Sequence, residues 1–263
     1  MKYTKMDALG NDYIYVLIEE NPELDIQELI NITPKISDRK TGIGSDGLIV
    51  IGRDNNQIWC RIFNADASEA ETCGNGLRCV ARLCYDKGLV KNNEFKIVLK
   101  KTGHIVNAIV DNDTVSIDMG KARVGKKESL THEGNKIEYI NVSMTNPHAV
   151  VECEDLDNLD IKKAGPFIEN HKNFPNRTNV EFFKIMDSDN IKFRVWERGS
   201  GETKACGSGA CAVFAAVYEQ KRCSDLVNVH MLGGTAKVEL KFGTIYLTGP
   251  ANYVTSGVYS FGG

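Results

Sequence analysis

Two short stretches of the chain carry the same reactive residue in the same setting. Each holds a cysteine followed at once by Gly-x-Gly, as Cys-Gly-Asn-Gly at residues 73–76 and as Cys-Gly-Ser-Gly at residues 206–209. Two thiols that approach one carbon from opposite sides can act as base and acid, so that one removes a proton and the other returns one to the opposite face. The doubled motif therefore predicts acid–base chemistry that inverts a carbon centre.

Both stretches lie within a longer internal repeat with an offset of 133 residues. From residue 46 to residue 86 the pairing needs no gap, and nine of these 41 positions are identical, including Arg61 with Arg194 and Glu69 with Glu202. Weaker echoes pair residues 9–12 with 144–147 and 119–122 with 248–251. The period is far longer than the roughly 20–50 residues of a solenoid repeat, so the sequence predicts two duplicated domains.

The chain is expected to divide into two domains. Residues 1–118 carry Cys73 and residues 119–251 carry Cys206, with the tail 252–263 returning to the first.

Strand-like segments joined by tight turns dominate both halves, which favours antiparallel pairing. Helices are predicted at 25–35, 75–88 and 208–221, and the last two are apolar all round their first turns, as buried helices are. The predicted fold is α+β, with two pseudo-twofold-related domains, each a curved antiparallel sheet wrapped around a central helix. The predicted strands are 13–18, 48–51, 58–63, 95–99, 105–110 and 114–119 in the first half, and 136–142, 149–153, 180–185, 191–196, 227–231, 236–242 and 244–248 in the second.

Each motif cysteine is predicted to stand at the start of a helix. The unpaired N–H groups and the dipole there carry partial positive charge, which should lower the pKa of the thiol. The same N–H groups can bind an anion such as a carboxylate, and the adjacent glycines let the backbone approach a ligand closely. Two such helix starts could hold one α-carboxylate and stabilise the charge that spreads onto it when the α-proton leaves.

Other readings of these residues remain open at this point. A covalent cysteine nucleophile would need a histidine partner, and His148 in the loop Asn-Pro-His at 146–148 is the candidate.

The run 42–47 matches G-x-G-x-x-G, but it follows a polar stretch and leads into a strand, the reverse of the order that dinucleotide binding requires. No Walker loop, Cys-x-x-Cys pair or zinc-ligand spacing is present in the sequence, so these motifs predict neither a nucleotide site nor a zinc site. The remaining cysteines stand mostly among apolar residues and are interpreted as buried, unreactive thiols; they are Cys60, Cys79, Cys84, Cys153, Cys211 and Cys223.

Bulk properties fit a small-molecule enzyme of the cytoplasm. The chain has 263 residues, 42% of them hydrophobic and 25% charged, and a net charge of −3, which gives no basic footprint for nucleic acid. No apolar run approaches the roughly 20 residues needed to cross a membrane, and residues 1–7 lack the apolar core of a signal peptide. Reduced thiols, a cytoplasmic location and no membrane partner are therefore expected.

At these residues the chain resembles the diaminopimelate epimerases, a family of cofactor-independent amino-acid racemases. The runs that carry the resemblance span nearly the whole chain and lie at 6–12, 63–69, 71–76, 146–148, 177–179, 197–203 and 205–209. The resemblance implies two domains that close over the substrate and a homodimer. It also implies interconversion of L,L- and meso-diaminopimelate, for lysine and peptidoglycan synthesis, without pyridoxal phosphate or metal.

The resemblance also implies a role for each matching residue. In the L,L to meso direction Cys206 would accept the proton and Cys73 would donate one, while His148 and Glu197 would orient the reacting amino group. The α-carboxylate would be held by Gly74, Asn75, Gly207 and Ser208. The rest of the substrate would be bound by Asn11, Asn64, Asn146, Asn179, Glu197 and Arg198.

The chain departs from the commonest family pattern at three places: Asp7-Ala8 stands for His-Gly, Ala67 for Gly, and Gly47 where some members have Gln. One alternative therefore keeps the two-thiol mechanism but acts on histidine, proline or lanthionine. Another is an isomerase on the same scaffold that uses a carboxylate, which the presence of both cysteines disfavours. A third is a non-catalytic amino-acid-binding protein, which would not require two thiols in register, or a redox protein, which would favour Cys-x-x-Cys.

Overall fold

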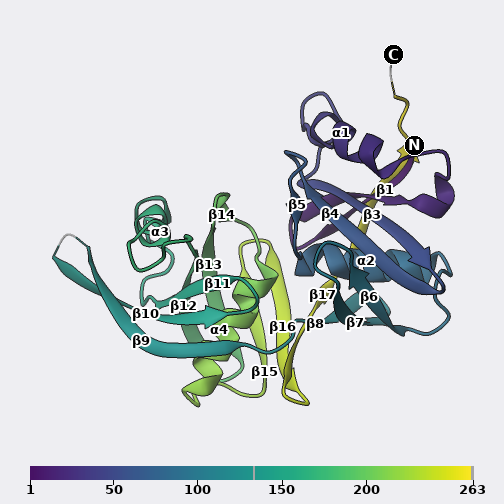
Figure 1. Cartoon of the computed structure of the whole chain (residues 1–263). Helices are drawn as coiled ribbons and strands as arrows, with labels where there is room; N and C mark the ends of the chain where they lie inside the picture. Colours follow the sequence, from purple (N-terminus) through teal and green to yellow (C-terminus); the bar gives the residue numbers. More distant parts are fainter. Residues whose placement is uncertain (133, 262–263) are drawn as a thin grey trace. The chain divides into compact units, whose positions relative to one another are not determined.

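The computed structural model describes residues 1–132 and 134–261, which form two compact units. Unit 1 comprises Met1–Ile117 together with the segment that begins at Gly249, and unit 2 comprises Asp118–Thr248 (Figure 1). The segment after Gly249 includes the tail predicted to return to the first domain, of which residues 262–263 lie outside the described part. Each unit is described by itself below.

Unit 1 is built on one curved sheet whose strands run in the spatial order β18-β1-β2-β3-β4-β6-β7-β8. A short strand, β5 (Glu69–Ala70), pairs with β4 and leads toward Cys73. The strands are β1 (Lys2–Ala8), β2 (Asn11–Leu17), β3 (Gly47–Asp54), β4 (Gln57–Asn64), β6 (Glu94–Leu99), β7 (His104–Asp111), β8 (Thr114–Asp118) and β18 (Asn252–Val258).

Unit 2 repeats this arrangement strand for strand, in the order β9-β10-β11-β12-β13-β15-β16-β17. Its short strand β14 (Gly201–Thr203) pairs with β13 as β5 pairs with β4. The duplication predicted from sequence is therefore present in the topology. The strands are β9 (Arg123–His132), β10 (Asn135–Ser143), β11 (Pro147–Glu152), β12 (Asn179–Asp187), β13 (Asn190–Glu197), β15 (Leu226–Met231), β16 (Gly234–Lys241) and β17 (Thr244–Pro250).

The α+β class is confirmed, but the prediction of purely antiparallel sheets is wrong at two places in each unit. Strands β2 and β3 pair in parallel, as do β4 and β6, and the equivalent pairs β11–β12 and β13–β15 are parallel too. Each of these connections crosses over through a helix, which returns the chain to the same end of the sheet. The helices concerned are α1 (Ile26–Ser37), α2 (Gly74–Asp86), α3 (Ile161–Glu169) and α4 (Gly207–Glu219).

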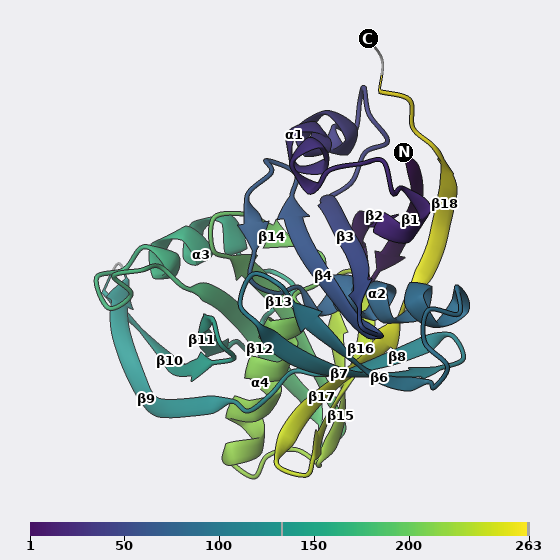
Figure 2. The same cartoon turned by 45° about the vertical axis from the view of Figure 1, so that its right-hand side comes forward.

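Helices α2 and α4 are the central helices that the sequence predicted. In α4 the residues from Gly209 to Val217 are buried, and the helix contacts strands β9 to β13, β15 and β16. Helix α2 contacts β1, β2 and β7, while α1 and α3 pack against β3–β4 and β12–β14 respectively (Figure 2). Helix α1 begins with a capping box in which Asp25 accepts from the backbone and Glu28 reaches back to the N-cap N–H. A 3₁₀ turn, η1 (Ile18–Glu20), follows β2.

Several elements were not predicted, and most of them lack the pattern that reveals such elements. Helix α3 contains Gly165 and Pro166, which argue against a helix, yet a Cβ at position 165 would lie 2.5 Å from Cγ of Trp196, so close packing requires glycine there. Strands β9 and β18 are mostly exposed and so show little alternation of buried and exposed residues. Strand β1 was also missed, although it alternates in burial along its length.

The repeat is not gapless in three dimensions. The register of β12 shifts between Ile185 and Asp187, which adds one residue relative to β3. Upstream of that shift the sequence offset pairs Leu48 with Glu181, whereas the strand register pairs Ile49 with Glu181, because these two residues face Ile62 and Val195 at equivalent positions of β4 and β13.

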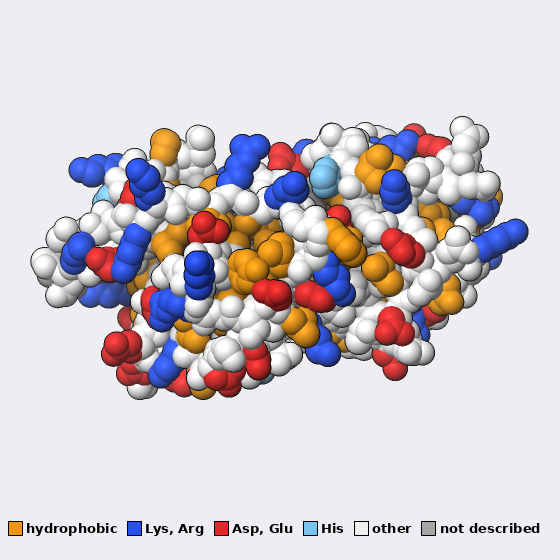
Figure 3. Space-filling model, turned by 90° about the horizontal axis from the view of Figure 1, so that it is seen from below, with side chains coloured by type: hydrophobic (Ala, Val, Ile, Leu, Met, Phe, Trp, Pro, Cys, Tyr) orange, Lys and Arg blue, Asp and Glu red, His pale blue; other side chains and the backbone are white. Residues whose placement is uncertain are grey.

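Acidic and basic side chains are interspersed with apolar ones on the face drawn in Figure 3, in keeping with the small net charge of −3. Among the described residues, no helix combines the length and the apolar character needed to span a membrane.

Candidate functional site

In unit 1, Cys73 is the N-cap residue of α2. Its Sγ accepts a hydrogen bond from the backbone N–H of Gly76 at 3.3 Å, and its S–H donates to Oδ1 of Asn11, also at 3.3 Å. The side chain is partly exposed. The predicted helix start and Asn11, which was predicted as a substrate-binding residue, therefore meet at this thiol.

The orientation of Asn11 is fixed by Asp46, a residue that the sequence did not point to. Nδ2 of Asn11 donates to Oδ2 of Asp46 at 2.7 Å, and the backbone N–H of Asp12 donates to the same oxygen at 3.1 Å. Arg39 donates to the other oxygen of Asp46 at 2.8 Å. Asp46 belongs to the glycine-rich run 42–47, so this loop supports the groups around Cys73. The feature of the sequence that could have indicated Asp46 is an acidic residue between glycines.

Asn75 lies in the first turn of α2 and is 3% exposed. Nη2 of the fully buried Arg78 donates to its Oδ1 at 2.9 Å, and Nε of Arg78 donates to the carbonyl of Pro250 at 3.3 Å. Asn64 lies at the end of β4, where its Nδ2 donates to the hydroxyl of Ser68 at 3.0 Å. Of the residues predicted for unit 1, the structure thus gathers Asn11, Cys73, Gly74 and Asn75 at one helix start, whereas the recorded bond of Asn64 is to its own turn.

In unit 2, Cys206 is the N-cap residue of α4 and is 6% exposed. Its Sγ lies 3.5 Å from the hydroxyl oxygen of Ser208. The expected lowering of the thiol pKa is wrong for this residue. Burial raises the pKa of Cys206 well above its usual value, and the nearby carboxylates of Glu197 and Glu181 raise it further, because a thiolate here would lose its water and meet negative charge. The helix start does not outweigh these effects.

Glu197 ends β13 close to this thiol. It accepts a short hydrogen bond from the hydroxyl of Thr203 on β14. Burial raises the pKa of the Glu197 carboxyl, and the Thr203 and Cys206 hydrogen bonds act in the opposite direction. The carboxylate therefore lies within hydrogen-bonding reach of Cys206.

A line of side-chain contacts leads from Ser208 into the interior of unit 2. Nδ2 of Asn146 donates to Oγ of Ser208 at 3.3 Å, and Oδ1 of Asn146 lies 3.0 Å from Nε2 of His148. Nδ1 of His148 lies 2.7 Å from Oε1 of Glu181, and both of these side chains are fully buried. Glu181 was not predicted. The feature of the sequence that could have indicated it is a charged residue inside the apolar strand β12, on the same face as Asn179.

Asn179 and Arg198 are joined through the backbone. Oδ1 of Asn179 accepts from the N–H of Arg198 at 2.9 Å, and its Nδ2 donates to the carbonyl of Pro147 at 3.0 Å. Asn179 thus ties the loop that carries Asn146 to the turn that carries Arg198. The guanidinium of Arg198 is exposed and reaches the carbonyl of Asn176 at 3.4 Å.

A second buried acid, Glu169 of α3, also holds the turn that carries Arg198, and it is 3% exposed. It accepts hydrogen bonds from Nε1 of Trp196 at 2.7 Å and from the N–H of Gly199 at 2.9 Å, and it forms an ion pair with Arg177. Glu169 was not predicted, because a glutamate near the end of a helix is usually solvated.

The identical Arg and Glu of the repeat form the same ion pair in both units. Nε of Arg61 donates to Glu69 at 2.8 Å, and Nε of Arg194 donates to Glu202 at 2.9 Å. Each pair joins the long strand to the short strand that leads into the cysteine. This explains why these residues recur in register with the thiols.

The prediction of burial holds for four of the six remaining cysteines. Cys60, Cys79, Cys84 and Cys211 are buried, whereas Cys153 and Cys223 are partly exposed. Burial raises the pKa of both Cys79 and Cys84 to about 12 and that of Cys60 further still. Among the residues that the structure describes, no group of three or more His, Cys, Asp or Glu side chains is placed to hold a metal ion.

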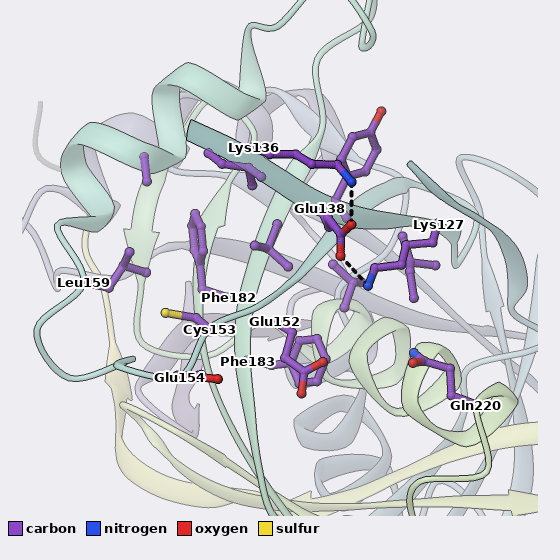
Figure 4. Close-up of a pocket in the computed structure, with 16 residues that line it drawn as sticks. Lys127, Lys136, Glu138, Glu152, Cys153, Glu154, Leu159, Phe182, Phe183 and Gln220 are labelled. Carbon is purple, nitrogen blue, oxygen red and sulfur yellow. Dashed lines mark hydrogen bonds and ion pairs between the residues drawn. The ribbon is translucent and has the colours of Figure 1, made fainter. Parts of the chain in front are cut away.

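A surface cavity of about 620 Å³ lies in unit 2, away from Cys206 (Figure 4). Its rim carries Lys127 and Lys136, which both form ion pairs with Glu138, and its wall includes Cys153, whose pKa is raised by partial burial. None of the predicted site residues lines it. Because Lys127, Lys136 and Glu138 are held in ion pairs and no predicted site residue lines it, this cavity is a weaker candidate for catalysis than the two helix starts.

Comparisons with known proteins identify the family of the chain. A family model described as diaminopimelate epimerase matches residues 3–125 and 140–254. The diaminopimelate epimerase of Bacillus cytotoxicus is 40% identical over 98% of this chain and 97% of its own length, and that of Methanococcus maripaludis strain C5 is 39% identical over 98% and 99%.

Solved structures with the same fold are more distant in sequence. A phenazine biosynthesis protein of the PhzF family from Enterococcus faecalis has a TM-score of 0.75 at 15% identity and covers 99% of this chain and 100% of its own. A hydroxyproline epimerase from Agrobacterium vitis has a TM-score of 0.69 at 16% identity, with coverage of 98% and 90%. At such identities the likeness concerns the fold alone.

Proposed function

The chain belongs to the diaminopimelate epimerase family, a family of isomerases, and we propose that it converts L,L-diaminopimelate to meso-diaminopimelate by proton transfer between two thiols, without a cofactor. The observation that carries this proposal is that Cys73 and Cys206 are the N-cap residues of α2 and α4, which hold equivalent places in the two sheets. The reaction would serve lysine and peptidoglycan synthesis.

The proton transfer divides between the two thiols. In the L,L to meso direction the thiolate of Cys206 removes the α-proton, and the thiol of Cys73 delivers a proton to the opposite face. The S–H of Cys73 already points to Oδ1 of Asn11, which keeps it in its donor form. Because its pKa is raised, the thiolate of Cys206 is a stronger base once formed, which suits the removal of a weakly acidic α-proton.

The substrate's α-carboxylate is taken up by the two helix starts. The backbone at Gly74 and Asn75 and at Gly207 and Ser208 supplies N–H groups that have no partner inside their helices. These groups would stabilise negative charge as it develops on the carboxylate during proton removal. The arrangement requires domains 1–118 and 119–251 to be related by a pseudo-twofold axis and to close over the substrate.

The other groups recognise the rest of the molecule. His148 and Glu197 orient the reacting amino group, and Glu197 can accept from an ammonium as a carboxylate. Arg198 is suited to the distal carboxylate, since its exposed guanidinium can form two parallel hydrogen bonds. The amides of Asn11, Asn64, Asn146 and Asn179 would complete the contacts to the distal amino acid.

Exchange of the α-proton in D2O tests this function. Protein freed of metal and pyridoxal phosphate is incubated separately with L,L-diaminopimelate, histidine, proline and lanthionine, and the α-proton signal is followed by NMR. We expect exchange and inversion with diaminopimelate alone. Exchange with one of the other amino acids, and none with diaminopimelate, would replace the proposed substrate.

We further propose that the protein is a cytoplasmic homodimer joined through β18. Reduced thiols at both helix starts favour the reducing compartment. Strand β18 pairs with β1 at the edge of its sheet, and Tyr253, Val254 and Val258 on it are 47%, 54% and 71% exposed. An apolar edge strand is suited to pair with the same strand of a second copy. Sedimentation velocity should show a dimer that Val254→Asp with Val258→Asp converts to monomer, whereas Leu232→Asp, at a 59% exposed position of unit 2, leaves it intact.

A further inference from the structure

The carboxylate of Glu181 is enclosed in unit 2 and has no place in the reaction as described above. Its side chain is 0% exposed. Oε1 lies 2.7 Å from Nδ1 of His148, and Oε2 is buried without a hydrogen-bond partner among the described residues. A buried carboxylate with an unsatisfied oxygen is unfavourable for folding, so its presence calls for a functional reason.

The duplicated unit shows that the fold does not need this carboxylate. By strand register the residue equivalent to Glu181 is Ile49. A Cβ on Gly76 would lie 2.7 Å from Cδ1 of Ile49, and a Cβ on Gly209 would lie 2.9 Å from Oε1 of Glu181. The two side chains therefore occupy the same space beneath the first turn of α2 and of α4, and one of them is apolar.

The histidine that Glu181 contacts also has an apolar-bodied counterpart. His148 faces Asn179 on the parallel strand β12, as Tyr13 faces Gly47 on β3. The polar pair His148 and Glu181 thus stands where unit 1 has Tyr13 and Ile49. Unit 2 has acquired a buried acid and a ring nitrogen donor at the floor of its half-site.

We propose that Glu181 is a positioning residue for the epimerase reaction: its Oε1 accepts from Nδ1–H of His148 and holds the ring so that Nε2–H donates to Oδ1 of Asn146. A carboxylate can only accept a hydrogen bond, so it selects the ring nitrogen that donates to it. The ring then fixes the amide of Asn146, and that amide holds the hydroxyl of Ser208 beside the Cys206 thiol, through contacts of 3.0, 3.3 and 3.5 Å. This inference rests on the proposed function, because its effect on turnover is read in that reaction.

The groups around Glu181 interact electrostatically. Glu181 acts on both Glu197 and Cys206, and His148 is the basic group among them. A histidine held in one orientation by Glu181 keeps its two N–H groups on Glu181 and Asn146, so neither donates to the thiol of Cys206. The thiol is then free to exchange its proton with the substrate.

The proton position on His148 can be measured without any substrate. The five histidines are labelled with ¹⁵N, two-bond proton–nitrogen spectra are recorded, and His148 is assigned from the signals that His148→Gln removes. We expect protons on both Nδ1 and Nε2 of His148 in the wild type, and loss of one of them in Glu181→Gln, whose neutral amide can both donate and accept. A wild-type spectrum without a proton on Nδ1 would overturn the inference.

Turnover of L,L-diaminopimelate is compared in the same proteins. We expect kcat to fall about tenfold in Glu181→Gln and about a hundredfold in Glu181→Ile, which copies the residue of unit 1, because an oriented hydrogen bond to a charged group is lost. Glu152→Gln, on the neighbouring strand β11, removes an exposed carboxylate paired with Arg222 and should change kcat less than about twofold.

The outcomes separate the inference from the function on which it rests. A wild type that does not epimerise diaminopimelate refutes the proposed function, while the histidine spectrum still tests the inference. If the wild type is active, both Glu181 variants turn over normally and the His148 signals do not change, then Glu181 has no positioning role. Urea unfolding of each variant ensures that rates are compared for folded protein. If Glu181→Ile does not fold, Glu181→Gln, which is close to Glu in shape, decides the question.

Discussion

Asp46 holds the amide of Asn11 in one orientation, with Nδ2 of Asn11 donating to Oδ2 of Asp46 at 2.7 Å. The other end of that amide, Oδ1, is left to accept from the thiol of Cys73 at 3.3 Å. Unit 2 reaches its thiol from Glu181 through three intervening side chains. The two halves of the duplication thus support their cysteines with acids that come from different strands or loops and act over different numbers of contacts.

Asp46→Asn is expected to lower kcat for epimerisation about tenfold. The substituted amide can donate to Asn11 as well as accept from it, so Asn11 is free to turn its Nδ2 toward the thiol and lose the contact that holds S–H. A hydrogen bond to a charged group is worth about 1.5–3 kcal/mol, which corresponds to roughly a ten- to hundredfold change in rate. Steady-state kinetics with L,L-diaminopimelate measures this.

The matched control for that variant is Asp54→Asn, also in unit 1, where the carboxylate is 60% exposed and paired with Lys100. It should leave kcat within about twofold of the wild type, since exposed ion pairs contribute little. Equal losses in the two variants would mean that Asp46 acts only through general stability or charge.

Cys73→Ala and Cys206→Ala should each lower the rate of epimerisation by about a thousandfold or more. Each variant lacks one of the two groups that must act on opposite faces of the α-carbon, and general acid–base catalysis contributes about 10²–10⁴. The rate is followed as inversion of the α-carbon by NMR or by a change in optical rotation.

The control for the thiol variants is Cys153→Ala, which removes the thiol that lines the cavity of Figure 4. Activity within about twofold of the wild type is expected, because small surface changes away from a site have little effect. Strong loss of activity in Cys153→Ala, with Cys73→Ala active, would move the catalytic centre to that cavity.

The free energy of unfolding should fall as the pH rises from 7.5 to 9.5 under reducing conditions. Burial raises the pKa of Cys79 and of Cys84 to about 12, whereas in the unfolded chain a cysteine titrates near 8.5. Above pH 8.5 the unfolded chain releases these protons and the folded protein keeps them, so the stability they contribute at lower pH is lost at up to about 1.4 kcal/mol per pH unit for each thiol.

Urea unfolding at the two pH values measures this loss. Cys84→Ala supplies the comparison, because removing one of the buried thiols should make the decline with pH shallower, whatever its effect on stability at pH 7.5. A stability that stays level to pH 9.5 would contradict the raised pKa values.

The parts of the fold that could be predicted are those that leave a periodic or repeated trace. Helices α2 and α4 were predicted because they combine a fixed motif with buried apolar turns, and the α+β class followed from the many strand-like runs. The parallel pairs β2–β3 and β4–β6 could not be predicted, because strand direction depends on how a crossover helix packs and not on the strands themselves.

Site residues could be predicted where the chemistry requires a particular residue type. They could not be predicted where a residue serves only to orient another side chain. The thiols lie at the helix starts that the Cys-Gly-x-Gly motifs predicted, whereas His148, expected in a loop, lies in strand β11. Asp46, Glu169 and Glu181 could not be found, because a carboxylate that orients another side chain has no fixed spacing from it in sequence. The raised pKa of Cys206 was also beyond prediction, since it depends on how deeply the helix start is buried.

The sheet of unit 1 takes its outermost strand, β18, from beyond the whole of unit 2. During synthesis the ribosome therefore completes the contiguous chain of unit 2 before it releases the residues that finish unit 1. The N-terminal half must wait with the edge of β1 unpaired until residues 252–258 emerge. A translation pause or premature stop late in the message would thus damage the half that was made first.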